Sequence, residues 1–206
     1  MNATPLRTSR DLRRDAIIEV ARQVFFEEGY AAASMSSIAA RLGGSKGTLY
    51  NYFRSKEELF EAQVRKDCDR FAEDAFIPLQ SDDRPIGEVL TQLGERYLTH
   101  LFSDWAVRTY RVVVAEAIRS PQLARMFYDA GPAVGLKRLE TYLETANARG
   151  VVKIDDCANA AGEFLTLCRG HTHFIYSLNL QGPPNPGQIK DHVHHAVRLF
   201  LKSYGA

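Results

Sequence analysis

Apolar residues recur at three- and four-residue spacing along almost the whole chain of 206 residues, and no segment sustains an alternation of apolar and polar residues. This spacing is typical of α-helices with one buried face, whereas a half-buried strand repeats every second residue. Glycine, proline and clusters of polar residues divide the pattern into segments. The sequence therefore predicts an all-α protein of about nine helices, and the chain is long enough to bury its own core.

The N-terminal segments are short and closely spaced. A first helix is expected over about residues 9–28, starting at Ser9 or Arg10. Ser34 and Ser45 are each placed as the N-cap of a further short helix, and the Gly43–Gly44 pair lies between the two. Two short helices joined by a tight glycine turn are typical of a helix-turn-helix.

The helix that follows Ser45 has two different faces. Leu49 and Phe53 are four residues apart and are expected to pack inward. Lys46, Tyr50 and Asn51 point elsewhere and carry groups that recognise guanine, adenine, a thymine methyl or phosphate. The candidate DNA-binding residues are Ser34, Ser36, Ser45, Lys46, Gly47, Thr48, Tyr50, Asn51, Tyr52 and Lys56. Two alternatives stay open, namely that the serines are only helix caps and that the lysines are only solvated charges.

Charge divides the chain in the same way. Residues 1–56 hold nine Lys and Arg against five Asp and Glu, a net charge of +4, while residues 57–206 hold 17 against 20, a net charge of −3. A basic N-terminal end on a mildly acidic body indicates a nucleic-acid surface at that end. We therefore predict a DNA-binding domain over residues 1–56 and a helical ligand-binding and dimerisation domain over residues 57–206, connected within a continuous fourth helix.

The run from Ser34 to Phe60, SMSSIAARLGGSKGTLYNYFRSKEELF, resembles the DNA-binding signature of the TetR family, and FFEEGY at residues 25–30 resembles the end of that family's first helix. Two positions depart from the pattern: Gly44 replaces an apolar turn residue, and Ser37 replaces a frequent acidic one, so a looser turn and a weaker cap are expected. The resemblance implies a repressor that binds a pseudo-palindromic double-stranded DNA operator as a dimer, with a recognition helix in each of two successive major grooves.

The body is expected to hold six further helices. They follow about Ser55 to Pro78, Ile86 to Phe102, Trp105 to Arg119, Gln122 to Arg149 with a possible break at Gly131 and Pro132, Asp156 to Leu178, and Gln188 to Tyr204, with a loop at Gln80 to Pro85. The segment from Arg108 to Pro132 resembles the ligand-sensing C-terminal domain of the AefR-like branch of the family. This resemblance implies that a small, mostly apolar effector releases the protein from DNA. The sequence does not identify that effector.

Large apolar side chains with a few polar groups among them favour a mostly apolar pocket in the body. The candidate ligand-binding residues are Phe102, Trp105, Tyr110, Arg111, Phe127, Tyr128, Phe164, Leu167, His171 and Phe174. Any one of these is alternatively a core residue, and Arg111 is alternatively half of a buried pair with Glu116. Effector binding is expected to act on the DNA-binding end through the fourth helix.

The last two helices are the expected homodimer contact, since four of them across a two-fold axis would form a bundle. Leu165, Cys168, Val193, Val197 and Leu201 have suitable spacing, and Gly162 and Gly170 would allow close approach. The alternative is that these residues complete the core of each protomer.

Other functions receive less support from the sequence. His171, His173, His192, His194 and His195 would be the ligands of a metal sensor or a helical metalloenzyme, and Cys68, Cys157 and Cys168 the thiols of a redox sensor. No catalytic motif, phosphate-binding loop or metal signature is recognised, so the prediction is of no enzyme, no cofactor and no bound metal. No apolar run is long enough to span a membrane, and we expect a cytoplasmic protein.

Overall fold

The structure is a computed structural model that describes residues 8–80 and 84–205, and it is all-α, as predicted. Ten α-helices and one short 3₁₀ helix occur in the described residues. They are α1 (Ser9–Glu28), α2 (Met35–Leu42), α3 (Lys46–Tyr50), α4 (Lys56–Ala75), the 3₁₀ helix η1 (Ile77–Gln80), α5 (Ile86–Leu101), α6 (Asp104–Glu116), α7 (Pro121–Ala130), α8 (Pro132–Ala148), α9 (Cys157–Ser177) and α10 (Pro186–Tyr204). The possible break at Gly131 and Pro132 is realised, and it separates α7 from α8. Of the expected loop at Gln80 to Pro85, residues 81–83 lie outside the described residues.

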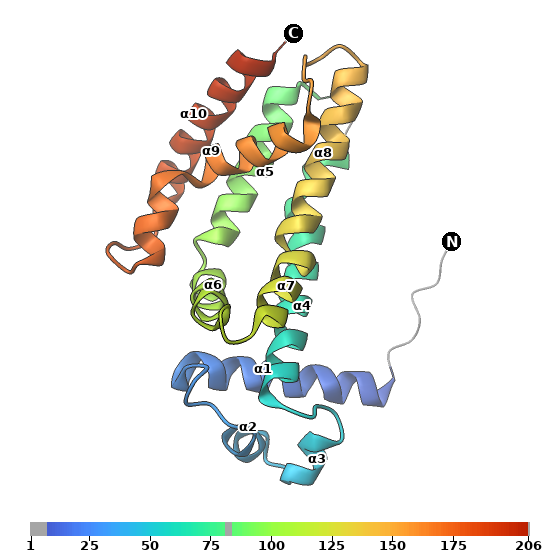
Figure 1. Ribbon diagram of the computed structural model, residues 1–206, viewed down its shortest axis with the longest axis vertical. Coiled ribbons are helices and arrows are strands. Elements are labelled where there is room, and N and C mark those ends of the chain that lie inside the picture. Colours follow the sequence, from blue (N-terminus) through green and yellow to red (C-terminus); the bar gives the residue numbers. More distant parts are fainter. Residues whose placement is uncertain (1–7, 81–83, 206) are drawn as a thin grey trace.

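Helices α1 to α3 form a small head at one end of the molecule (Figure 1). Each begins at a side chain that accepts a backbone N–H of its first turn, provided by Thr8, Ser34 and Ser45. The head core includes Ile38 and Leu49, neither of which has any exposed surface. Helices α2 and α3, which are too short to be stable alone, are thus held in the head by packing.

Helix α3 is shorter than expected. It ends at Tyr50, whereas the spacing of Leu49 and Phe53 predicts a helix through both. The amides of Tyr52 and Phe53 both donate to the Leu49 carbonyl, at 3.0 and 3.1 Å, so the chain turns tightly after the helix. Phe53 still reaches the head core, where it is 1% exposed, because this turn directs it inward.

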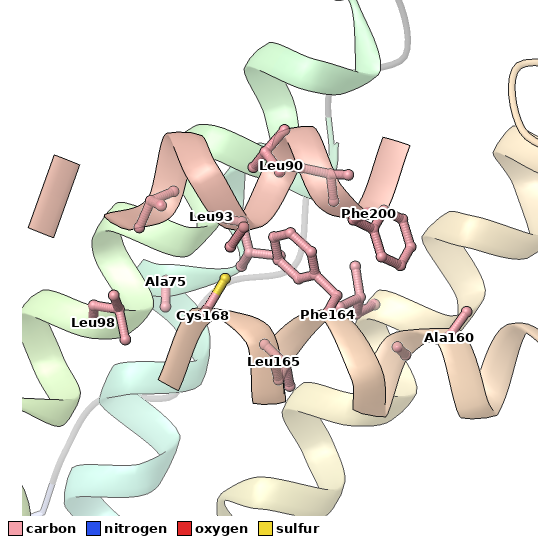
Figure 2. Close-up of a cluster of buried hydrophobic side chains, with 14 of the residues drawn as sticks. Ala75, Leu90, Leu93, Leu98, Ala160, Phe164, Leu165, Cys168 and Phe200 are labelled. Carbon is pink, nitrogen blue, oxygen red and sulfur yellow. The ribbon is translucent and has the colours of Figure 1, made fainter. Parts of the chain in front are cut away.

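Helices α5, α8, α9 and α10 form the far end of the body (Figure 1). Their core brings Leu90 and Leu93 of α5 together with Phe164 and Cys168 of α9 and Phe200 of α10 (Figure 2). At Gly94 a Cβ would lie 2.7 Å from Val193 Cγ1, so α5 and α10 approach closely because this residue has no side chain.

The residues predicted for a dimer contact belong to this core. Leu165, Cys168, Val193 and Val197 are buried in their own protomer, and Leu201 packs partly buried against the same cluster. Gly162 has no close neighbour, with Leu136 Cδ2 4.0 Å from the position of a Cβ. Gly170 is the site of a kink in α9, with φ of 54°, against which the His192 ring of the same chain packs. A dimer formed through α9 and α10 must therefore use the faces of these helices that point away from the core.

Head and body share more than the fourth helix. Val113 of α6 and Leu123 and Ala130 of α7 are buried in the same cluster as the head residues, together with Cys68 of α4. At Gly131 a Cβ would lie 2.9 Å from the Cys68 Sγ, so the start of α8 lies directly against α4. The head is therefore joined to the body by packing along α4, α6 and α7. Among the described residues, no helix is long and apolar enough to cross a bilayer.

Candidate nucleic-acid interface and internal cavity

The turn between α2 and α3 is fixed by backbone hydrogen bonds. Gly43 adopts a left-handed conformation with φ of 68°, and its amide donates to the Ala40 carbonyl at 3.2 Å. The Gly44 amide donates to the Ala39 carbonyl at 3.3 Å. A Cβ at Gly44 would meet only Arg13 Nη2 at 3.9 Å, so a larger residue is not excluded there by space. The turn is closed by its backbone, and no loosening at Gly44 is seen.

The cap of α2 is complete despite the absence of an acidic residue. The Ser34 hydroxyl accepts the Ser37 amide at 3.0 Å, and the Ser37 hydroxyl accepts the Ser34 amide at 3.0 Å. A serine thus closes the reciprocal capping box in which a glutamate is more usual. The expectation that Ser37 weakens this cap finds no support in the geometry.

The outward face of α3 carries the polar side chains that the sequence predicts. Lys46, Gly47, Tyr50 and the C-cap Asn51 are exposed, and Tyr50 retains 51% of its surface. Ser36 is exposed on the neighbouring helix α2. On the opposite side Leu49 has no exposed surface. This short helix therefore presents one polar face to a partner and fastens the other to the head.

The remaining predicted DNA contacts already have intramolecular partners. Ser34 and Ser45 are caps, and the Ser45 hydroxyl also lies 3.0 Å from that of Thr48. Lys56 Nζ donates to the Tyr30 carbonyl at 2.9 Å and lies 4.6 Å from the centre of the Tyr30 ring. Tyr52 is half-buried against the head core.

Two arginines of α1 complete the surroundings of the turn and were not named from the sequence. Arg13 approaches Gly44, and the Arg14 guanidinium lies over the Phe53 ring at 4.8 Å. Both are exposed and basic. The signal that would have found them is the excess of arginine at the start of the first helix.

The body contains a partly open cavity of about 270 Å³ bounded by α4 to α9. Trp105, Tyr110 and Phe127 are the predicted ligand residues that line it. Most of the other lining side chains are aromatic or apolar. They come from helices far apart in the sequence, so periodicity alone does not group them.

The other predicted ligand residues lie elsewhere. Phe164 packs against Phe200 in the body core, with ring centres 5.3 Å apart, and Leu167 is partly buried against that core. Phe102 is buried against Tyr176. Arg111 donates to the carbonyls of Tyr176 and Ser177 at 2.7 and 2.8 Å, and so ties α6 to the end of α9 in place of the expected pairing with Glu116. Tyr128, His171 and Phe174 are exposed and outside the cavity lining.

Four further lining residues carry the cavity's polar or stacking chemistry, and the sequence did not point to any of them as an effector contact, although it named His173 as a possible metal ligand. They are Phe71, His100, Arg169 and His173. The His100 ring stacks on Phe71 with ring centres 3.7 Å apart. Burial lowers the pKa of His100 to about 4, and burial together with the Arg169 charge lowers that of His173 to about 4. Both imidazoles are therefore neutral at physiological pH.

Two buried nitrogen atoms of the cavity lining have no hydrogen-bond partner. These are the indole Nε1 of Trp105 and the Nε2 of His173, whose side chain is 5% exposed. Arg169 lies at the exposed edge. Because both histidines are neutral, it is the one charged side chain among the described lining residues. Its guanidinium bonds the Tyr97 hydroxyl and lowers the pKa of that group, while burial raises it by more. Unpartnered buried polar atoms are uncommon in folded proteins, and these two belong to side chains that line the cavity.

The histidines and cysteines do not converge in the described part of the chain, where no group of three potential metal ligands occurs. His192 Nε2 bonds the Leu167 carbonyl at 3.1 Å, and His195 Nδ1 bonds Arg198. Burial raises the pKa of Cys68 and of Cys168 to about 12, and it raises the pKa of Cys157 as well. The three free thiols are thus protonated and weakly reactive at neutral pH.

A helix-turn-helix with an exposed polar recognition face, packed on a helical body with an internal cavity, defines the class of helix-turn-helix transcriptional regulators. Residues 17–63 match the tetR family of bacterial regulatory proteins, and residues 88–206 match the C-terminal domain of AefR-like transcriptional repressors. The chain belongs to the TetR family, whose members are regulators and not enzymes.

Solved structures and curated proteins give the same result. A TetR-family transcriptional regulator from Mesorhizobium loti is 26% identical, covers 97% of this chain and 100% of its own, and superimposes with a TM-score of 0.86. The flavonoid-responsive regulator FrrA is 34% identical, with 94% and 97% of the two chains covered and a TM-score of 0.80. The transcriptional regulator UidR of Escherichia coli K12 is 31% identical over 59% of this chain and 60% of its own. The chain spans between 35 and 60% of the length of the first curated relatives that it matches.

Proposed function

We propose that this protein is a ligand-responsive transcriptional repressor that binds a pseudo-palindromic operator as a homodimer. The observation that carries the proposal is the outward face of α3, where Lys46, Gly47, Tyr50 and Asn51 are exposed. Behind it Leu49 and Phe53 are buried, so the face is held in a fixed position on the head. Exposed lysine, asparagine and tyrosine at the start of a recognition helix supply contacts to phosphates and to base edges.

We propose that residues 1–56 bind DNA and that residues 57–206 bind the effector and form the dimer. Ser34, Ser36, Ser45 and Thr48 lie near the N-termini of α2 and α3, where free amides favour phosphate. Tyr52 and Lys56 flank this surface in a partly buried setting. A regulator with this role acts on the chromosome, and we place it in the bacterial cytoplasm.

The cavity is the proposed effector site, and its walls support a route to the DNA-binding end. Cys68 of α4 and Phe127 of α7 line the cavity and also belong to, or pack against, the head core. A ligand that favours one arrangement of α4 and α7 would shift the position of the head in the same direction. Both helices, and not α4 alone, thus connect effector and operator. FrrA, described as flavonoid-responsive, supports control by a small organic molecule.

Dimerisation through α9 and α10 would use their outward faces. Exposed residues of α10 include His194, Arg198, Leu199 and Lys202, and these lie opposite the buried Val193 and Val197. The interface is therefore expected to be mixed in character, with a polar rim and few large apolar side chains. A monomer mass by light scattering at micromolar concentration would contradict the dimer.

Selection of bound sequences from randomised DNA tests the main proposal. We expect enrichment of an inverted repeat whose half-sites are separated by about one helical turn, roughly 10 base pairs. The same duplexes, mixed with protein that carries spin labels at Asn51, give the distance between the two heads with and without effector. Recovery of no dyad sequence would contradict operator binding, and an unchanged distance distribution would contradict the proposed route. Derepression of a reporter in cells lacking the protein distinguishes a repressor from an activator.

A further inference from the structure

We propose that the cavity is specific for a planar aromatic molecule of two or three rings that carries a hydroxyl group, and that Trp105 and His173 recognise its polar groups. The inference rests on the proposed function, since it names the chemical class of effector for the same site. Three features of the lining support it, namely the ring surfaces, the two unpartnered nitrogen atoms and the sign of the charge.

The ring surfaces limit the shape of the ligand. The Phe71 and His100 rings stack face to face, with 14° between their planes, and the Trp105 ring lies beside His100 at an angle of 48°. Gly131 and Gly135 of the lining leave no room for a side chain, because a Cβ would lie 2.9 Å from the Cys68 Sγ at Gly131 and 2.6 Å from the Phe76 ring at Gly135. The volume of about 270 Å³ is slightly below the roughly 300 to 1,000 Å³ of most drug-sized sites. A flat ring system fits these walls better than a long flexible chain does.

The two unpartnered nitrogen atoms define the polar groups that the ligand needs. The indole Nε1–H of Trp105 is only a donor, so it requires an acceptor such as a hydroxyl, ether or carbonyl oxygen. The Nε2 of His173 donates in one tautomer and accepts in the other, and a hydroxyl satisfies it in both. A wholly apolar ligand would leave both atoms without partners and away from water, which lowers its affinity.

The charge of the lining decides against cationic ligands. Burial keeps His100 and His173 neutral, with the pKa of each lowered to about 4. The positive charge of Arg169 lies at the exposed edge. Arg169 would repel an ammonium group there, and the lining offers it no carboxylate, so that only the aromatic ring faces would attract it. A weakly acidic hydroxyl on an aromatic ring meets all three conditions.

Calorimetric titration of the protein with three compounds of nearly equal size tests this inference. The probes are 2-naphthol, 2-methylnaphthalene and 2-(aminomethyl)naphthalene, which place a hydroxyl, a methyl or an ammonium-bearing group on the same ring system. We expect 2-naphthol to bind at least tenfold more tightly than either of the others. Quenching of tryptophan fluorescence would report the same binding from inside the cavity, because Trp105 is the single tryptophan of the sequence.

Substitutions then assign the preference to the two residues. Trp105→Phe and His173→Phe keep an aromatic ring and remove the nitrogen atom, and each is expected to lower the affinity for 2-naphthol at least fivefold while changing that for 2-methylnaphthalene less than twofold. Ile118→Ala, at a 93% exposed position in the turn after α6 and outside the cavity lining, is the control and should leave both affinities unchanged. Each variant is first checked by its circular dichroism and melting temperature.

Equal binding of naphthol and methylnaphthalene, tighter binding of the amine, no binding of naphthol by the folded wild type, or an unchanged preference in both phenylalanine variants would each overturn the inference. Operator selection is carried out without any ligand and gives a separate result. Failure to bind naphthol together with recovery of an operator would therefore overturn only the ligand class, whereas naphthol binding without an operator would contradict the proposed function.

Discussion

The DNA-facing surface of the head and the cavity of the body are built in opposite ways. On the head, the polar side chains of α3 point outward from a five-residue helix, and the apolar ones fasten it from behind. In the body, buried polar atoms such as Trp105 Nε1 belong to side chains that line a cavity, among aromatic residues from several helices. The first surface depends on local sequence order, and the second depends on how distant segments meet.

The two sites nevertheless share structural support. Phe127 lines the cavity and packs against the head core, and Val113 and Leu123 of the body are buried in that core. Substitutions near either site should therefore have one of two kinds of effect. Changes to the shared packing should affect both sites, whereas changes to exposed or unpartnered polar groups should affect only one.

Phe53→Ala is expected to have the largest effect. The side chain is 1% exposed in the head core, and deletion of a buried phenylalanine costs about 3 to 5 kcal/mol of unfolding free energy. Because this core includes α6 and α7, the loss should appear in the unfolding of the whole chain and not in a separate transition of the head. Urea unfolding followed by circular dichroism measures it. A loss under about 1 kcal/mol, or an early transition confined to the head, would contradict the shared core.

Gly131→Ala tests the junction directly. The new Cβ would lie 2.9 Å from the Cys68 Sγ, and overpacking of this kind costs about 1 to 3 kcal/mol. Cys68→Ala removes the opposing sulfur atom, so the double variant should be more stable than the sum of the two single changes predicts. If the changes in unfolding free energy of the two single variants add up to that of the double variant, Cys68 of α4 does not obstruct a side chain at position 131.

Lys46→Ala and Tyr50→Ala should each weaken operator binding at least tenfold, about 1.4 kcal/mol, without a change in the circular dichroism spectrum. Both side chains are exposed, so the fold loses no packing with them. Gel-shift titration on the selected operator gives the affinities, and Ile118→Ala, at a 93% exposed position in the turn after α6, serves as the control. Retention of full affinity in both variants would remove this face as the DNA contact.

Protonation of the buried histidines is expected to cause the smallest change in stability near neutral pH. The folded-state pKa of His100 and of His173 is lowered to about 4, below the ordinary value of 6.5, so the unfolded chain binds more protons between these values. The stability contributed by the neutral rings is fully present above pH 6.5 and is lost as the pH falls toward 4. His100→Phe keeps a ring against Phe71 and should make the decline shallower. Thermal melts from pH 7.5 to 4.5 measure it, and an equal slope in the variant would refute the assignment.

Much of the head was predictable because its determinants are close in the sequence. Caps at Ser34 and Ser45 and a left-handed Gly43 are local features, and the structure contains each of them. The early end of α3 was not predicted. The turn after α3 directs Phe53 into the core, so Leu49 and Phe53 are both buried, just as they would be on a continuous helix. Spacing alone does not distinguish these two conformations.

The sequence by itself determined an all-α chain, its helix boundaries to within a few residues, the polar face of α3 and the TetR family. Only the tertiary structure decided which aromatic residues surround a cavity. It placed Trp105, Tyr110 and Phe127 there, put Phe164 in the core, and added His100, Arg169 and His173. The physical reason is that capping and periodicity act within one helix, whereas a cavity is the space left where several helices fail to fill the volume between them.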